Sequence, residues 1–226
     1  MASDVDICNL ALAHLGDNAT IASIDPPEGS AQAEHCARFF PIARDALLEM
    51  KNWSFASRRA LLPQLTACCD QWDYIYGLPA DCMRPVSVLP NDAEDDYVSS
   101  LMPSDIPWSA RAYAPAYQAG YYAPQPYQIE TNSSGQKILM TNQEQALLRY
   151  QAYVTDSSVF PPLFVTTLSW HLASMLAGPV IKGDAGAAEA KRCMEMMAAF
   201  LSQASNSDAE QRDIRVEHLV GWMSGR

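Results

Sequence analysis

The sequence predicts an α+β fold, in which an N-terminal and a C-terminal helix pair form a four-helix bundle and a small antiparallel β domain is inserted between them. Three observations lead to this prediction. Apolar residues recur at steps of three and four near both ends, short aromatic runs separated by turns fill the middle, and the chain ends in an apolar tail. The expected parts are residues 1–52 for the first helix pair, 53–155 for the β domain, 156–206 for the second helix pair and 207–226 for an extended C-terminal arm.

The first helix is expected from about Ser3 to Leu15, and Ser3 and Asp6 offer a capping-box start. Gly16 offers a left-handed stop. The residues expected on its inner face are Val5, Cys8, Leu12 and Leu15.

The second helix has the most regular apolar pattern in the chain. Its expected inner face consists of Ala33, Cys36, Phe40, Ala43, Leu47 and Met50. Pro41 lies inside this pattern and removes one backbone donor, so we expect a kink or a restart near Phe39 and Phe40.

Short strands are expected in the middle of the chain, where the apolar period changes. They cover residues 54–62, 72–77, 84–89, 127–131, 137–141 and 147–154. The segment NSSGQ at 132–136 is typical of a hairpin turn.

A Tyr- and Pro-rich insertion at 91–126 interrupts the β domain and begins with the acidic run DAEDD. Its aromatic residues are candidates for contact with the tail or with a neighbouring subunit, because rigid aromatic side chains lose little entropy on burial. They are Trp108, Tyr113, Tyr117, Tyr121 and Tyr122. A decorated surface loop is the alternative interpretation.

The third helix is expected to start at the proline pair 161–162 and to stop at about Ala177, before Gly178 and Pro179. The fourth is expected to start near Asp184. Its predicted inner face consists of Ala187, Ala190, Met194, Met197, Leu201 and Ala204.

The chain turns polar after Ser205 and then ends in IRVEHLVGWMSGR. Apolar residues at a terminus suggest a docking arm. The residues expected to dock are Ile214, Val216, Leu219, Val220, Trp222, Met223 and Arg226.

Composition and charge exclude several classes of protein. The formal net charge is −11, which disfavours tight binding to a phosphate backbone but lets DNA slide past a wall of this charge. The six cysteines show no zinc-site spacing and are expected to be free thiols of a reducing cytoplasm, and no signal peptide is visible. Residues 159–181 are long enough to span a bilayer, but their polar and helix-breaking residues favour a buried helix and no membrane span.

The sequence contains none of the common motifs for catalysis. There is no G-x-S-x-G elbow, phosphate-binding loop, dinucleotide fingerprint or zinc helix, so we expect no enzyme activity, no catalytic residues, no cofactor and no metal. A histidine–cysteine metal site, a Cys68–Cys69 redox pair and a calcium-binding DAEDD run are weaker interpretations. A pair of carboxylates for glycan cleavage stays open, because any two of 26 acidic residues could meet in the fold.

Three segments together resemble the tail tubular protein A family, the head-to-tail adaptors of short-tailed phages. They are FFPIARDALLEMKNWSFASRRALL, YIYGLPADCMRPVSV and LRYQAYVTDSSVFPPLFVTTLSWHLASMLAGPV, and the resemblance spans nearly the whole chain. The residues that carry the motifs are Arg44, Asp45, Trp53, Phe55, Tyr76, Pro79, Asp81 and Arg84.

The resemblance implies a virion structural protein made in the host bacterial cytoplasm. It implies a homo-oligomeric ring, twelvefold in the family, that joins the portal protein to the tail nozzle protein, with the C-terminal segment directed toward the portal. DNA would pass through the ring without specific binding. The insertion is longer than expected of a compact member, so its partner is open. The alternatives are a virion-associated peptidoglycan hydrolase and a protein-interaction module unrelated to phages.

Overall fold

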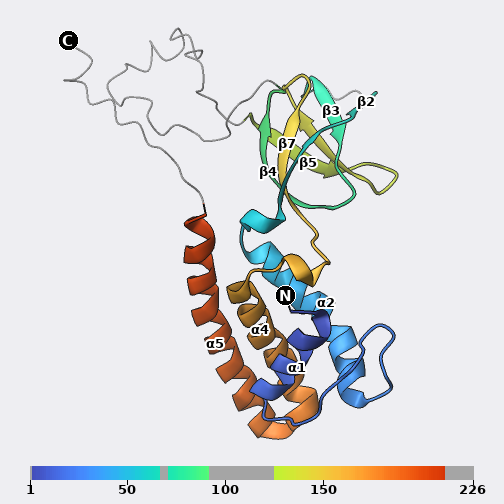
Figure 1. The fold of residues 1–226 in the computed structure, drawn as a ribbon. Helices are drawn as coiled ribbons and strands as arrows, with labels where there is room; N and C mark the ends of the chain where they lie inside the picture. Colours follow the sequence, from blue (N-terminus) through green and yellow to red (C-terminus); the bar gives the residue numbers. More distant parts are fainter. Residues whose placement is uncertain (1, 67–70, 92–124, 212–226) are drawn as a thin grey trace, which may run out of the picture. The chain divides into compact units, whose positions relative to one another are not determined.

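The computed structural model describes residues 2–66, 71–91 and 125–211. These residues form an α+β protein with four α-helices and two small antiparallel sheets. They divide into two compact units. Of the described residues, those up to Ala56 and those from Tyr153 to Gln211 form the helical unit, and those between Ser57 and Ala152 form the β unit (Figure 1).

Helix α1 (Asp4–His14) begins with the predicted capping box. The Asp6 amide donates to Ser3 Oγ at 3.2 Å, and the Ser3 amide donates to the Asp6 carboxylate at 2.9 Å. Gly16 has the predicted positive φ of 74°. The inner face differs by a small rotation from the prediction, because Leu15 caps the helix and is only half-buried. The buried residues are Ile7, Cys8, Ala11 and Leu12.

Helix α2 (Ala31–Met50) runs through Pro41 as one helix, so the predicted restart is wrong. One missing donor does not end a helix whose inner face is packed along its length. The predicted inner face is buried from Ala33 to Leu47. Met50 is the exception, with 48% of its surface exposed.

Helices α4 (Pro162–Ile181) and α5 (Gly183–Ala209) form a close hairpin. α4 begins at the predicted proline but continues through Gly178 and Pro179, so the predicted stop is wrong. The chain turns instead at Lys182 and Gly183, which have φ values of 62° and 61°. The hairpin is close because Gly186 has no side chain: a Cβ there would lie 2.9 Å from the carbonyl oxygen of Ala177.

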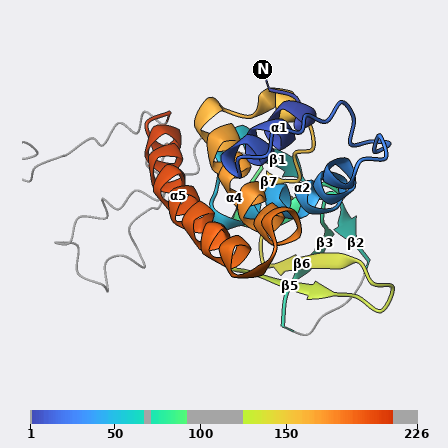
Figure 2. The ribbon, with the colours of Figure 1, turned by 90° about the horizontal axis from the view of Figure 1, so that it is seen from below.

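Helix α4 is the centre of the helical unit. It packs against α1, α2 and α5, and both views show it between α2 and α5 (Figures 1 and 2). By length and composition α4 could also cross a membrane, but 56% of its most apolar window is buried inside the protein. Such burial is typical of the core helix of a globular unit.

The β unit holds a three-stranded sheet of order β1-β7-β4 and a four-stranded sheet of order β2-β3-β6-β5. The strands are β1 (Ser57–Leu61), β2 (Gln64–Leu65), β3 (Tyr74–Gly77), β4 (Cys82–Leu89), β5 (Tyr127–Thr131), β6 (Lys137–Thr141) and β7 (Leu147–Ala152). The hairpin at 132–136 is confirmed, with β5 and β6 paired from Thr131 and Lys137 outward. The strand predicted at 54–62 begins later, because Ser54–Ala56 form a 3-10 turn.

Candidate functional site

The residues predicted to dock on partners lie outside the described residues. These are the arm residues Ile214, Val216, Leu219, Val220, Trp222, Met223 and Arg226, and the insertion aromatics Trp108, Tyr113, Tyr117, Tyr121 and Tyr122. The motif residues are described, and they fall into separate places within the two units. In the helical unit, Trp53 and Phe55 flank Ser54, which contacts the end of α5, the last described element.

An aromatic cluster forms where α2 ends and α4 begins. Trp53 packs edge-on against Phe164 with ring centroids 5.0 Å apart, and the Trp53 indole N–H donates to the Leu47 carbonyl at 3.0 Å. Phe55 lies 5.0 Å from Phe164 and 5.8 Å from Phe160. Edge-to-face pairs of this kind add stability beyond the burial of their area. The motif residues Trp53 and Phe55 therefore fasten the end of α2 to the start of α4.

The end of α5 is tied to the same place by a buried carboxylate. Asp208, only 8% exposed, accepts from the Ser54 amide at 3.0 Å and from the Ser54 hydroxyl at 2.5 Å. One turn earlier in α5, the Ser205 carbonyl accepts from Lys51 Nζ at 2.5 Å. We call the bonds of Asp208 and Ser205 to Ser54 and Lys51 the C-terminal clasp. The clasp fixes the last turns of α5, at the end of the described part of the helical unit.

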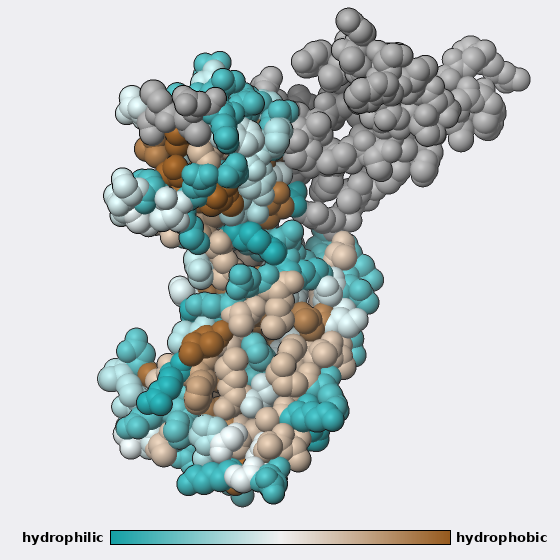
Figure 3. Space-filling model, turned by 180° about the vertical axis from the view of Figure 1, so that it is seen from behind, coloured by the Kyte–Doolittle hydropathy of each residue, from teal (hydrophilic) through white to brown (hydrophobic). Residues whose placement is uncertain are grey.

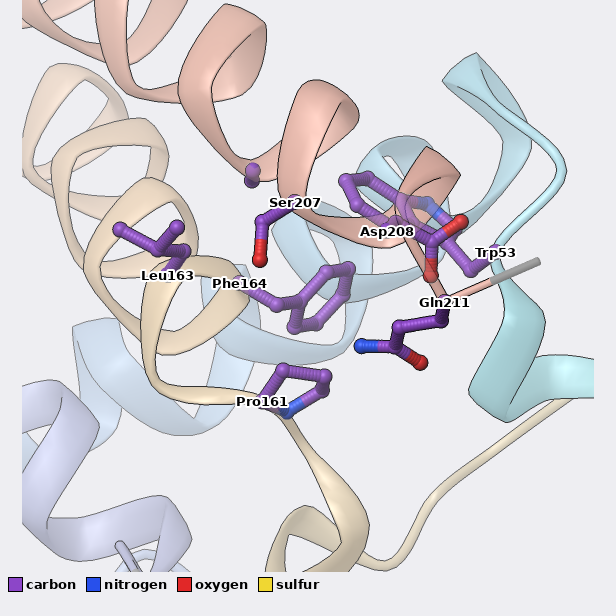
Figure 4. A pocket seen from close by; sticks show the side chains of 8 residues that line it. Trp53, Pro161, Leu163, Phe164, Ser207, Asp208 and Gln211 are labelled. Carbon is purple, nitrogen blue, oxygen red and sulfur yellow. The ribbon is translucent and has the colours of Figure 1, made fainter. Parts of the chain in front are cut away.

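A shallow hollow opens beside the clasp (Figure 4). Its lining residues are Trp53, Pro161, Leu163, Phe164, Ala204, Ser207, Asp208 and Gln211, and its cavity volume is about 20 Å³. Figure 4 shows Phe164 at its centre, with Pro161 and Ser207 on either side. Pockets for small-molecule ligands are much larger, about 300–1,000 Å³. The hollow has room for about one water molecule and is too small for a substrate.

In the β unit, the motif residues build a turn and its support. The Cys82 amide donates to the Pro79 carbonyl at 3.0 Å, which closes the turn before β4. Asp81 accepts from Arg58 Nη1 at 2.5 Å and from the Tyr150 hydroxyl at 3.0 Å. Burial raises the pKa of Tyr150, and its bond to Asp81 raises that pKa further. Asp81 thus joins β1, β7 and the turn.

The other motif residues also have structural surroundings. The Tyr76 hydroxyl donates to the Gln143 carbonyl at 2.8 Å, and Arg84 lies opposite Gln151 in the β4–β7 pair. On α2, Arg44 and Asp45 form an ion pair of 2.8 Å, with Arg44 the more buried partner. Each of these residues positions backbone or neighbouring side chains.

Chemistry-bearing side chains are scattered in the described part of the chain. No group of three or more His, Cys, Asp or Glu residues there could hold a metal ion. His171 is buried and its ring Nδ1 lies 3.2 Å from the Ala43 carbonyl oxygen; burial lowers its pKa. Cys8, Cys36, Cys82 and Cys193 are free and buried, and burial raises the pKa of Cys82 to about 11. A thiol of that pKa is a poor nucleophile at neutral pH.

Sequence reasoning missed Asp208 and Ser54. Asp208 sits in a polar run that we assigned to the arm, although α5 extends to Ala209. Its position did carry a signal, because the buried residues of α5 recur at steps of seven and four and Asp208 continues that series. They are Gly186, Cys193, Met197, Ala204 and Asp208.

No model of a protein family matches the sequence, and no curated protein matches it either.

Proposed function

We propose that this protein is the subunit of a head-to-tail adaptor ring of a short-tailed phage or prophage. The ring joins the portal protein to the tail nozzle protein and surrounds the DNA passage. The protein is a virion component without enzyme activity or cofactor, made in the bacterial cytoplasm. The basis for the family is the resemblance of the motif residues described above, whose order along the chain follows the adaptor pattern.

The observation that carries the proposal is the C-terminal clasp. An arm that docks on a separate ring needs a fixed starting point, because a long free tether lowers the effective concentration of its docking residues. Asp208 and Ser205 hold the last turns of α5 against Ser54 and Lys51. Only a few residues separate this anchor from the apolar sequence that starts at Ile214. The arrangement supports a role for residues 212–226 in attachment to the portal.

We propose further that α1, α2, α4 and α5 work as one bundle. Contacts of α4 with the other three helices support this, and so do the close hairpin at Gly186 and the aromatic cluster at Trp53. A ring under the load of packaged DNA needs stiff subunits with well-packed interiors. The formal net charge of −11 suits a passage through which DNA moves without binding.

The test is to mix the purified chain with the portal protein of the same phage or prophage and to image the mixture by electron microscopy. We expect rings of the chain stacked on the portal. A chain that neither forms a ring nor binds the portal would refute the proposal. Zymography on peptidoglycan tests the enzyme alternative, and lysis that is lost on mutation of one acidic residue would replace the adaptor role with a hydrolase.

A further inference from the structure

Two apolar strips of the helical unit stay exposed or half-buried after the four helices have packed. The α2 strip consists of Phe39, Ile42, Ala46 and Met50, of which Ile42 is 53% and Met50 48% exposed. The α5 strip consists of Ala187, Ala190, Met194, Ala198 and Leu201, of which Met194 is 43% exposed. Both recur at steps of three and four, so each forms a line along one side of its helix. Figure 3 shows apolar side chains over much of one face of this unit.

The α5 strip explains why our sequence prediction for this helix was only partly right. Met197 and Ala204 are buried as predicted, but Ala187 and Met194 are exposed, and Gly186 and Cys193 pack inside instead. Alanines occur all around α5, so the helix has an apolar line beyond the one that α4 covers. Within the described part of the chain, α5 packs mainly against α4.

The two strips belong to different flanks of the unit. α2 and α5 are both antiparallel to α4. Trp53 at the end of α2 contacts Phe164 at the start of α4, and α5 follows α4 through a hairpin. The two helices therefore run in the same direction, with α4 between them (Figures 1 and 2). Two different surfaces on two flanks favour a head-to-tail contact over a two-fold one.

Charges beside the strips complement one another in a parallel arrangement. Arg38 and Asp45 flank the α2 strip seven residues apart, and Asp184 and Lys191 flank the α5 strip at the same spacing with the opposite order of sign. When two parallel helices face each other, such flanking residues meet across the contact. A single register then pairs Arg38 with Asp184 and Asp45 with Lys191. One turn further, Glu49 and Glu195 come together with like charge.

We infer that the α5 strip of one copy packs against the α2 strip of the next copy, as the repeated contact of the ring. Bulky residues on α2 meet mostly alanines on α5, and small residues let two helices approach closely. Neighbours in a closed ring are related by a small rotation, so the two helices meet nearly parallel, as the charges require. The inference rests on the proposed function only for closure of the ring, because the contact itself needs just two copies.

Cysteine pairing tests which surfaces meet. A chain with Ile42→Cys is mixed with a chain with Ala187→Cys, which is nearly level with Ile42 in the proposed register, and the mixture is oxidised with copper–phenanthroline at high protein concentration. We expect a disulfide-linked dimer in the mixture, and its loss in either variant alone and in the unchanged chain, which controls for the native cysteines. Equal linking in the single-variant samples, or none in the mixture, would overturn the inference.

Blocking one strip at a time gives an independent test that needs no new bond. Ile42→Asp and Met194→Asp change exposed residues, so circular dichroism should show both chains folded. In sedimentation experiments we expect each variant alone to lose self-association. A mixture of the two should form a complex of two copies and nothing larger, because one intact strip is left on each. Growth beyond two copies, or no complex in the mixture, contradicts a head-to-tail contact.

Charge variants test the register. Glu195→Lys removes the like-charge pair of Glu49 and Glu195 and should strengthen the linking of Ile42→Cys to Ala187→Cys, whereas Lys191→Glu should weaken it. The opposite order would reject the parallel register. If the mixed dimers form but the chain binds no portal, the proposed function fails and this contact stands. If portal-bound rings form without linking between these strips, the contact fails and the adaptor function stands.

Discussion

Ser54 and Asp208 lie 154 positions apart in the chain, yet the Ser54 amide and hydroxyl both donate to the Asp208 carboxylate. Removal of the carboxylate leaves the half-buried Ser54 amide without its acceptor, and the Ser54 hydroxyl keeps only its bond to the Gln211 side chain, at a cost of about 1–3 kcal/mol. We therefore expect Asp208→Ala to lower the free energy of unfolding by that amount in urea titrations. Glu210→Ala, two residues further at an exposed position, is the control and should be nearly neutral. Equal stability of the two variants would show that the clasp contributes nothing.

The hairpin of α4 and α5 offers a matched pair of glycines. A Cβ at Gly186 would lie 2.9 Å from the Ala177 carbonyl oxygen, whereas a Cβ at Gly178 meets nothing within 4 Å. We expect Gly186→Ala to destabilise the protein by about 1–3 kcal/mol through overpacking. Gly178→Ala should stabilise it by up to about 1 kcal/mol, because alanine favours a helix interior. Thermal unfolding of both variants measures the difference in sign, and two effects of the same sign would contradict the close approach.

Trp53 and Phe164 join the end of α2 to the start of α4. The Trp53 indole is buried and hydrogen-bonded, and it packs edge-on against the Phe164 ring. Phe164→Ala should cost about 3–5 kcal/mol, as is usual for a buried aromatic residue replaced by alanine. Phe164→Leu keeps most of the volume and should cost less. Urea unfolding of the two variants checks this order, and a small effect of both would mean that the cluster is dispensable.

His171 should make stability depend on pH. Burial lowers its pKa in the folded protein, so the unfolded chain binds the proton more readily. The stability from the neutral ring is present above the unfolded value of about 6.5 and is lost as the pH falls from there toward the folded pKa. We expect urea unfolding at pH 7.5 and pH 5 to show this loss, and His171→Gln to reduce it. His14, whose pKa burial also lowers, should account for part of what is left.

Truncation after Gln211 should separate folding from attachment. This cut keeps Asp208 and its bonds to Ser54, so the unfolding free energy should stay close to that of the full chain. Portal binding, measured by co-sedimentation, should weaken severely because the apolar arm is gone. A cut before Asp208 removes the clasp as well and should destabilise the helical unit. Unchanged portal binding after the cut at Gln211 would show that the arm is not the attachment.

Local signals in the sequence predicted the parts of the fold that depend on neighbouring residues. The capping box of Ser3 and Asp6 and the hairpin at 132–136 need only residues a few positions apart. The packing of α5 needed more, because its many alanines gave several equivalent apolar lines. The apolar line that faces α4 is the one that contains Gly186, where α5 comes so close to the Ala177 carbonyl that no side chain fits.

The same limit applies to the candidate site. The motif residues Trp53 and Phe55 stood out because their segment resembles the adaptor pattern. Asp208 did not, because a carboxylate in a polar run is normally solvated and its burial depends on Ser54 at a great distance in the chain. Likewise, Gly178 and Pro179 predicted a helix end that tertiary packing overrides.

The chain enters the β unit through β1 and leaves it through β7, and these two strands are direct partners, with Ser57 opposite Gln151. The chain thus enters and leaves the β unit through one pair of adjacent strands. Such a segment can be exchanged as a cassette: a related sheet with the same two terminal strands could replace it without rethreading any helix. Evolution could in this way refit one scaffold to different neighbours, and a chimaera with a foreign insert would show whether the helices fold regardless of what they carry.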